Sequence, residues 1–153
     1  MLLSLLRHGT ADANAWDHGR RLTAVGRAEV ELIAGGLVRA GFRPGIILAS
    51  PLLRAQETAR IVAHHFPEVP LVTQELLAAG SAESLMWIAA DQQDPMLVGH
   101  EPTLGMLAAR LMGAPMNALP MERAGIAVFE VDRLPATRPA RLLLWSSPKW
   151  AGG

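Results

Sequence analysis

The sequence contains no cysteine and a single lysine, Lys149. The absence of cysteine excludes disulfide bonds, thiolate catalysis and cysteine metal sites, although it does not indicate a cellular compartment. Because lysine is nearly absent, the cationic chemistry of this chain depends on arginine. Lys+Arg and Asp+Glu both number 14, so no excess of charge points to nucleic acid or to an anionic membrane as a partner.

Long hydrophobic runs are also missing. No apolar stretch approaches the length of a membrane span. The N-terminal run Met1–Leu6 is too short for the apolar part of a signal peptide and no basic residue precedes it. We therefore expect a cytoplasmic protein with no membrane partner. The 153 residues, half of them hydrophobic, favour one globular domain spanning residues 1–153, and among oligomeric states a monomer is favoured.

Short apolar runs alternate along the chain with segments of helical periodicity. Strands are predicted over Leu2–Leu6, Ile46–Ala49, Leu71–Val72, Met96–Gly99, Gly125–Val131 and Arg141–Trp145. Helices are predicted to follow Thr23, Ser50, Ser81 and Pro102, with Ser50 as an N-cap and Pro51 in the first turn. This alternation favours an α/β fold, a three-layer αβα sandwich around a mostly parallel six-stranded sheet.

Polar side chains follow three of the predicted strands. Arg7 and His8 follow the first strand, Arg54 lies shortly after the second, and His100 follows the fourth. In open α/β sheets, ligands bind beyond the carboxyl ends of the strands. We therefore expect two guanidinium groups and two imidazoles to surround one small dianion.

These side chains suit phosphoryl transfer. The planar fork of arginine donates two parallel hydrogen bonds to a phosphate group. Histidine is substantially neutral near pH 7 and can attack phosphorus. Positioning and charge neutralisation are most of what phosphoryl transfer requires.

Each residue also has a simpler interpretation. Arg54 alone is typical of a solvated helix surface or an ion pair, His100 of a helix cap, and His8 of a buried structural histidine. A metal site is a further alternative. No carboxylate is spaced as a ligand with His8 or His100, and two arginines would repel a cation. We expect neither a metal nor a cofactor.

Three segments resemble the signature blocks of the histidine phosphatase superfamily, which has the phosphoglycerate-mutase-like fold. They are Leu6–Gly9 (LRHG), Ser50–Thr58 (SPLLRAQET) and Val98–Pro102 (VGHEP). Within this superfamily the chain is most similar to the small SixA-type phosphohistidine phosphatases. The resemblance implies a mixed central sheet with one late antiparallel strand, and chemistry without a metal.

The resemblance also implies roles for individual residues. His8 would be the nucleophile that becomes phosphorylated, and Arg7, Arg54 and His100 would complete the phosphate pocket. The residues expected to flank the site or bind substrate are Gly9, Asp17, Arg20 and Glu75. Larger members of the superfamily carry a carboxylate proton donor after the third strand, for which Glu75 is the match by order and Asp17 the other candidate.

Chain length bears on the substrate. The third strand and the next predicted helix are joined only by residues 75–81, so the pocket is expected to be shallow. An open pocket admits a phosphohistidine on a protein surface, which favours a phosphohistidine protein phosphatase. A small-molecule phosphomonoesterase of the same fold is the alternative, with a small phosphorylated substrate, and a catalytically silent phosphate-recognition module is a third hypothesis.

Overall fold

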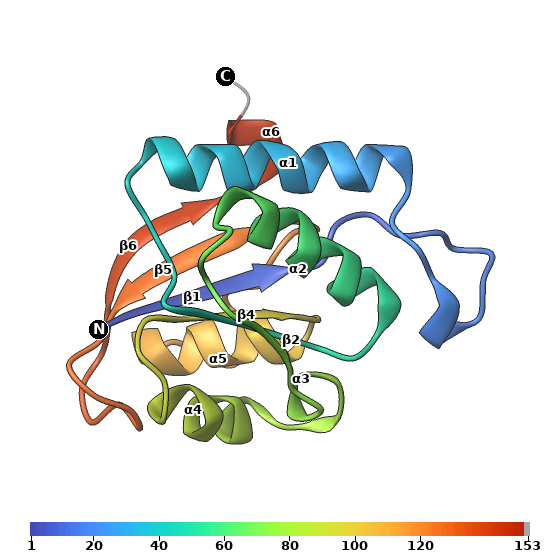
Figure 1. The fold of residues 1–153 in the computed structure, drawn as a ribbon. Helices are drawn as coiled ribbons and strands as arrows, with labels where there is room; N and C mark the ends of the chain where they lie inside the picture. Colours follow the sequence, from blue (N-terminus) through green and yellow to red (C-terminus); the bar gives the residue numbers. More distant parts are fainter. Residues whose placement is uncertain (152–153) are drawn as a thin grey trace.

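Six strands form one sheet in the computed structural model, which describes residues 1–151 (Figure 1). The strands are β1 (Leu2–Arg7), β2 (Ile46–Ala49), β3 (Leu71–Thr73), β4 (Pro95–Gly99), β5 (Ile126–Glu130) and β6 (Arg141–Ser146). Their order across the sheet is β3-β2-β4-β1-β5-β6. Strand β5 is antiparallel to β1 and β6, whereas β1, β2, β3 and β4 pair in parallel. The predicted mostly parallel sheet with one late antiparallel strand is confirmed.

Helices cover both faces of this sheet (Figure 1). They are α1 (Ala24–Arg39), α2 (Leu53–His65), α3 (Leu76–Ala79), α4 (Ala82–Ala90), α5 (Thr103–Met112) and α6 (Pro148–Ala151), with a 3-10 turn η1 (Asp17–Gly19). Helices α1 and α2 pack on one face of the sheet and α4 and α5 on the other. This arrangement is the predicted three-layer sandwich. Every helix within residues 1–151 is too short or too polar to cross a lipid bilayer.

Strand β1 is buried on both faces, which explains why its sequence is apolar apart from Ser4 and the terminal Arg7. Leu3 and Leu5 belong to the core beneath α4 and α5, whereas Leu6 belongs to the core beneath α1 and α2. All three side chains are fully buried, and burial of such a side chain stabilises a fold by about 2 kcal/mol. Strand β1 lies between β4 and β5 in the sheet, so its last residues leave the sheet between neighbouring strands.

Two of the helices begin directly after a residue whose side chain caps them, and a third does not. Thr23 Oγ1 accepts a hydrogen bond of 3.0 Å from the Gly26 amide and caps α1, as its position predicts. Ser81 caps α4 in the same way. The prediction for Ser50 is wrong, because α2 begins at Leu53 and has no side-chain cap. The four-residue helix α3 was not predicted, since so short a segment carries no visible periodicity.

Candidate active site

Strands β1, β2 and β4 end at the same level of the sheet. Arg7 pairs with Gly99, and Ala49 pairs with Val98. His8, the residue after β1, donates its amide to the Gly99 carbonyl at 3.1 Å. The residues that follow these strands therefore leave the sheet together, which explains how positions far apart in the sequence come into contact.

His8 is only 6% exposed and both of its ring nitrogens have partners. Nδ1 lies 2.7 Å from the carbonyl oxygen of Gly9, and Nε2 lies 3.3 Å from Nε of Arg54. A carbonyl oxygen only accepts, so Nδ1 donates. A guanidinium nitrogen only donates, so Nε2 accepts and carries the free electron pair. The two contacts thus fix the tautomer whose Nε2 is a nucleophile.

The surroundings of His8 favour its neutral form. Burial, together with the charges of His100, Arg54 and Arg7, lowers the pKa of His8 to about 3 against the opposing hydrogen bond to Gly9. Burial, followed by the charge of Arg54, lowers the pKa of His100 to about 4. Both rings are neutral at pH 7. Their centroids lie 5.2 Å apart at an angle of 54°.

This shift predicts a pH dependence of stability. His8 has a pKa of about 3 in the folded protein and 6.5 when unfolded, so below pH 6.5 the unfolded chain binds a proton that the native protein does not. The stabilisation that comes from burying His8 in its neutral form is therefore complete above pH 6.5. It is lost progressively as the pH falls from 6.5 towards 3. In urea denaturation at pH 6, 5 and 4, the wild type should lose about 1 kcal/mol per pH unit relative to His8→Ala. A constant difference between the two proteins would mean that native His8 titrates normally.

Arg54 lies in the first turn of α2 and is 7% exposed. Its Nε faces His8, its Nη1 donates to the Asp17 carbonyl at 2.8 Å, and its Nη2 lies 3.1 Å from the Asp17 carboxylate. Burial lowers the pKa of Arg54, and the charge of Asp17 opposes this. The guanidinium is therefore held in one orientation beside Nε2 of His8.

Arg7 and His100 complete the cluster. Arg7 Nη1 donates to the Met121 carbonyl at 2.9 Å, and burial lowers the pKa of Arg7 while the charge of Glu101 opposes the shift. His100 Nε2 lies 2.7 Å from Ser50 Oγ. Within residues 1–151, Arg7 Nε and His100 Nδ1 are buried without a hydrogen-bond partner. Buried polar atoms normally have partners, and a phosphoryl oxygen is a suitable partner for such a nitrogen.

Ser50 and Thr58 belong to the site although sequence reasoning assigned neither of them to it. Ser50 Oγ accepts a 3.2 Å bond from the Leu52 amide as well as contacting His100. Thr58 is fully buried, accepts from the Gly9 amide at 3.1 Å and donates to the Arg54 carbonyl at 2.8 Å. Both lie in the segment Ser50–Thr58. Thr58 follows Arg54 by one helical turn, and this spacing could have indicated from the sequence that Thr58 lies on the same side of the helix as Arg54.

Gly9 holds His8 in place. Its carbonyl accepts from His8, and its amide donates to Thr58. A Cβ at this position would lie 2.8 Å from the Gly26 carbonyl oxygen and 2.9 Å from a methyl group of Val30. The chain after β1 therefore packs so closely on α1 that a side chain does not fit. This contact places Gly9 in support of the cluster, and its amide is already committed to Thr58.

The three remaining candidate residues differ in their placement. Asp17 contacts Arg54 directly. Arg20 lies 4.0 Å from the Asp17 carboxylate and donates through Nε to the Asp12 carbonyl at 2.9 Å. Glu75 is exposed at the start of α3, and within residues 1–151 no hydrogen bond or ion pair joins it to the cluster. The structure thus joins Asp17 directly, and Arg20 through Asp17, to the cluster.

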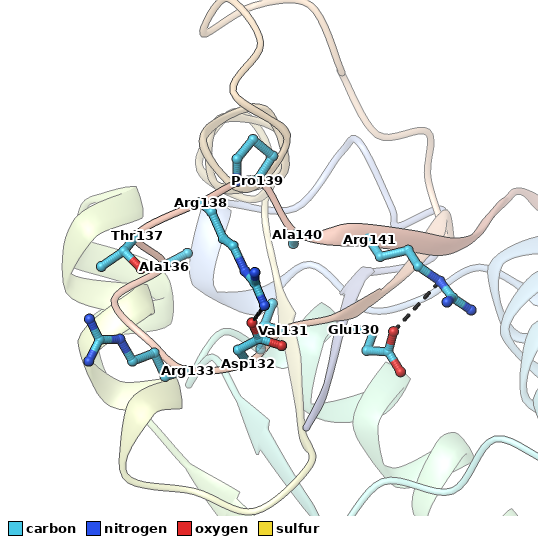
Figure 2. Close-up of a pocket in the computed structure, with 10 residues that line it drawn as sticks. All are labelled: Glu130, Val131, Asp132, Arg133, Ala136, Thr137, Arg138, Pro139, Ala140 and Arg141. Atoms are coloured by element: carbon cyan, nitrogen blue, oxygen red, sulfur yellow. Dashed lines mark ion pairs between the residues drawn. The ribbon is translucent and has the colours of Figure 1, made fainter.

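A cavity of about 600 Å³ lies elsewhere, in the connection between β5 and β6 (Figure 2). The Val131 amide in this connection donates to the Met1 carbonyl. The cavity therefore lies near the start of β1, whereas His8 follows the end of that strand. Its Arg138 pairs with Asp132, and its Arg141 pairs with Glu130. Arg7, His8, Arg54 and His100, here called the His8 cluster, do not line this cavity. In the described part of the chain, no three His, Asp or Glu side chains are placed to hold a metal ion.

Known proteins are similar to this chain in sequence and in structure. A profile of the histidine phosphatase superfamily (branch 1) matches residues 3–95. An uncharacterized protein of Picosynechococcus is 36% identical over an alignment of 162 positions, and the alignment covers 98% of each chain. The structure of the protein histidine phosphatase SixA in complex with tungstate has a TM-score of 0.85 and 24% identity, with 97% of this chain and 98% of that one covered.

Other solved structures are named for different substrates. A protein of Agrobacterium tumefaciens, proposed to be a phosphohistidine phosphatase SixA, has a TM-score of 0.83 and 26% identity, with 96% and 97% of the two chains covered. A mycobacterial glucosyl-3-phosphoglycerate phosphatase has a TM-score of 0.72 and 18% identity, with 95% and 98% covered. The shared fold therefore serves phosphatases that act on proteins and on small molecules.

Proposed function

Because the chain belongs to the histidine phosphatase superfamily (branch 1) and is SixA-like, we propose that it is a phosphohistidine protein phosphatase that works through a phosphorylated His8. One observation carries this proposal. The buried Nε2 of His8 lies 3.3 Å from Nε of Arg54 and accepts its hydrogen bond. A nucleophile and a cation for the phosphoryl oxygens are thus already side by side.

In the first step, the electron pair on Nε2 of His8 attacks phosphorus in line. A new N–P bond forms, and the bond between phosphorus and the substrate imidazole breaks. The departing nitrogen keeps the electron pair, and the substrate imidazole leaves as a neutral ring because its other nitrogen already carries a proton. Arg7, Arg54 and His100 hold the phosphoryl oxygens and offset their developing charge. The Gly9 carbonyl, 2.7 Å from Nδ1, stabilises the positive ring of phospho-His8.

In the second step, water attacks phosphorus and the bond to His8 breaks. Inorganic phosphate leaves, and Nε2 regains its electron pair. We propose that no metal takes part, since two guanidinium groups supply the positive charge that a metal would bring. Metal removal should then leave turnover unchanged.

Two features support a substrate on a protein surface. Transfer between two imidazoles is nearly isoenergetic, and the leaving imidazole is readily protonated near pH 7, so a strong proton donor is dispensable. The connection from β3 to α4 holds only the short helix α3, which leaves little chain to roof the site. Both features fit a protein-bound phosphohistidine better than a sugar phosphate.

A small-molecule phosphomonoesterase is the second candidate, supported by neighbours such as the mycobacterial glucosyl-3-phosphoglycerate phosphatase. Such a reaction needs a proton donor for the leaving alkoxide. Asp17 is the better placed of the two candidate carboxylates, because it contacts Arg54 and Glu75 does not.

A comparison of donors separates these candidates. We expect kcat/KM for a histidine phosphocarrier protein, phosphorylated on its histidine, to exceed that for sugar phosphates and nucleoside monophosphates by on the order of 100-fold. Vanadate should inhibit both reactions, because it mimics the transferring phosphoryl group. Faster turnover of the esters would establish the second candidate. Binding of phosphate without turnover of any donor would leave only phosphate recognition.

A further inference from the structure

Trp16 is 74% exposed, although it lies in a loop that contacts the candidate active site. This loop spans residues 11–21 and includes η1. Figure 1 draws it in blue, projecting past the carboxyl end of β1 and beside α2. A large exposed aromatic side chain adds nothing to the core, so its position needs another explanation.

The indole of Trp16 is held in a defined orientation. It stacks on the ring of His18 with centroids 5.3 Å apart and an angle of 13° between the planes. It also lies against Gly19, where an added Cβ would come within 3.2 Å of the indole Nε1. The Gly19 amide donates to the Trp16 carbonyl at 3.0 Å. Trp16 and His18 therefore present a flat aromatic surface to solvent, here called the Trp16–His18 stack.

Asp17 ties this stack to the catalytic cluster. It stands between the two aromatic residues in the sequence, and both its carbonyl and its carboxylate bond to Arg54. Arg20 closes the loop through its bond to the Asp12 carbonyl. Because Arg54 also contacts Nε2 of His8, the stack has a fixed position relative to the nucleophile. Through Asp17 and Arg54 it adjoins the site, on the exposed loop.

We propose that the Trp16–His18 stack is the surface on which the polypeptide around a phosphohistidine docks, and that Trp16 selects protein donors over small ones. This inference rests on the proposed function. A small donor held by the His8 cluster has few atoms left to cover an indole at the rim, whereas the residues that flank a phosphohistidine extend past the phosphoryl group. Rigid exposed tryptophans are typical of positions that dominate protein interfaces.

The test compares two donors that share the same P–N bond. One is a histidine phosphocarrier protein phosphorylated on its histidine, and the other is free phosphohistidine. For Trp16→Ala we expect about a tenfold loss of kcat/KM with the protein donor, mainly through KM, and little change with free phosphohistidine. Trp16→Phe should retain most of the activity, because it keeps an aromatic ring on His18. Trp87→Ala is the matched control, since Trp87 is 55% exposed on α4.

Three outcomes would overturn the proposal. An equal loss with both donors would mean that Trp16 only supports Asp17 and Arg54. No loss with either donor would mean that nothing docks on the stack. A loss of equal size in Trp87→Ala would indicate a general surface effect. If wild-type protein hydrolyses esters but not the phosphorylated protein, the proposed function itself fails, and the role of Trp16 fails with it.

Discussion

His8→Ala should abolish turnover with every donor, while the protein remains folded. The substitution removes the imidazole nitrogen that accepts from Arg54, and without it no phosphoenzyme can form. The loss is expected to reach at least about 10⁴-fold, in line with removal of a catalytic nucleophile. Steady-state assays of the purified variant with a phosphorylated protein and with free phosphohistidine measure it.

A second histidine provides the control for this substitution. His65 lies at the end of α2 and pairs with Glu31 at 2.6 Å on the surface. His65→Ala should keep near-normal turnover. Circular dichroism of His8→Ala should match the wild type, because the His8 side chain bonds only to Gly9 and Arg54 in the described residues. Substantial turnover by a folded His8→Ala protein would exclude His8 as the nucleophile.

Arg54→Ala is expected to lower kcat by on the order of 10²–10³-fold. The guanidinium contacts Nε2 of His8, and in the proposed mechanism it offsets the charge that develops on the phosphoryl oxygens. Its effect should therefore fall on kcat more than on KM. Rapid-quench measurement of phosphoryl transfer to His8 would place the loss in the chemical step.

Two variants calibrate the Arg54 result. Arg54→Lys keeps the charge but loses the planar fork, so we expect intermediate activity. Arg60 lies on the same helix and is exposed, and Arg60→Ala should behave as the wild type. Near-normal turnover by Arg54→Ala would mean that this arginine only anchors Asp17.

The sheet and the meeting of its strand ends could be predicted from the sequence. Unbroken apolar runs are typical of strands buried on both faces, and parallel strands end at one edge. The polar residues directly after β1 and β4 therefore had to meet near Arg54. The order of the strands and helices and the periodicity of their apolar residues determine this meeting, and both can be read from local sequence.

The details of the loops could not be predicted in this way. Ser50 has the pattern of an N-cap, but its hydroxyl contacts His100, a residue fifty positions away. Asp17 bonds to Arg54 through a contact that no local pattern encodes. In both cases a tertiary contact outweighs the local signal. The role of Glu75 stays a prediction.

The most direct test of the account is to trap the phosphoenzyme. The protein is mixed with a phosphorylated histidine phosphocarrier, quenched in alkali, in which phosphohistidine survives, and analysed by peptide mass spectrometry. We predict one added phosphoryl group on Nε2 of His8, and its absence in His8→Ala. A phosphoryl group on another residue, or turnover of the phosphocarrier with no phosphorylated peptide at any time, would contradict the account.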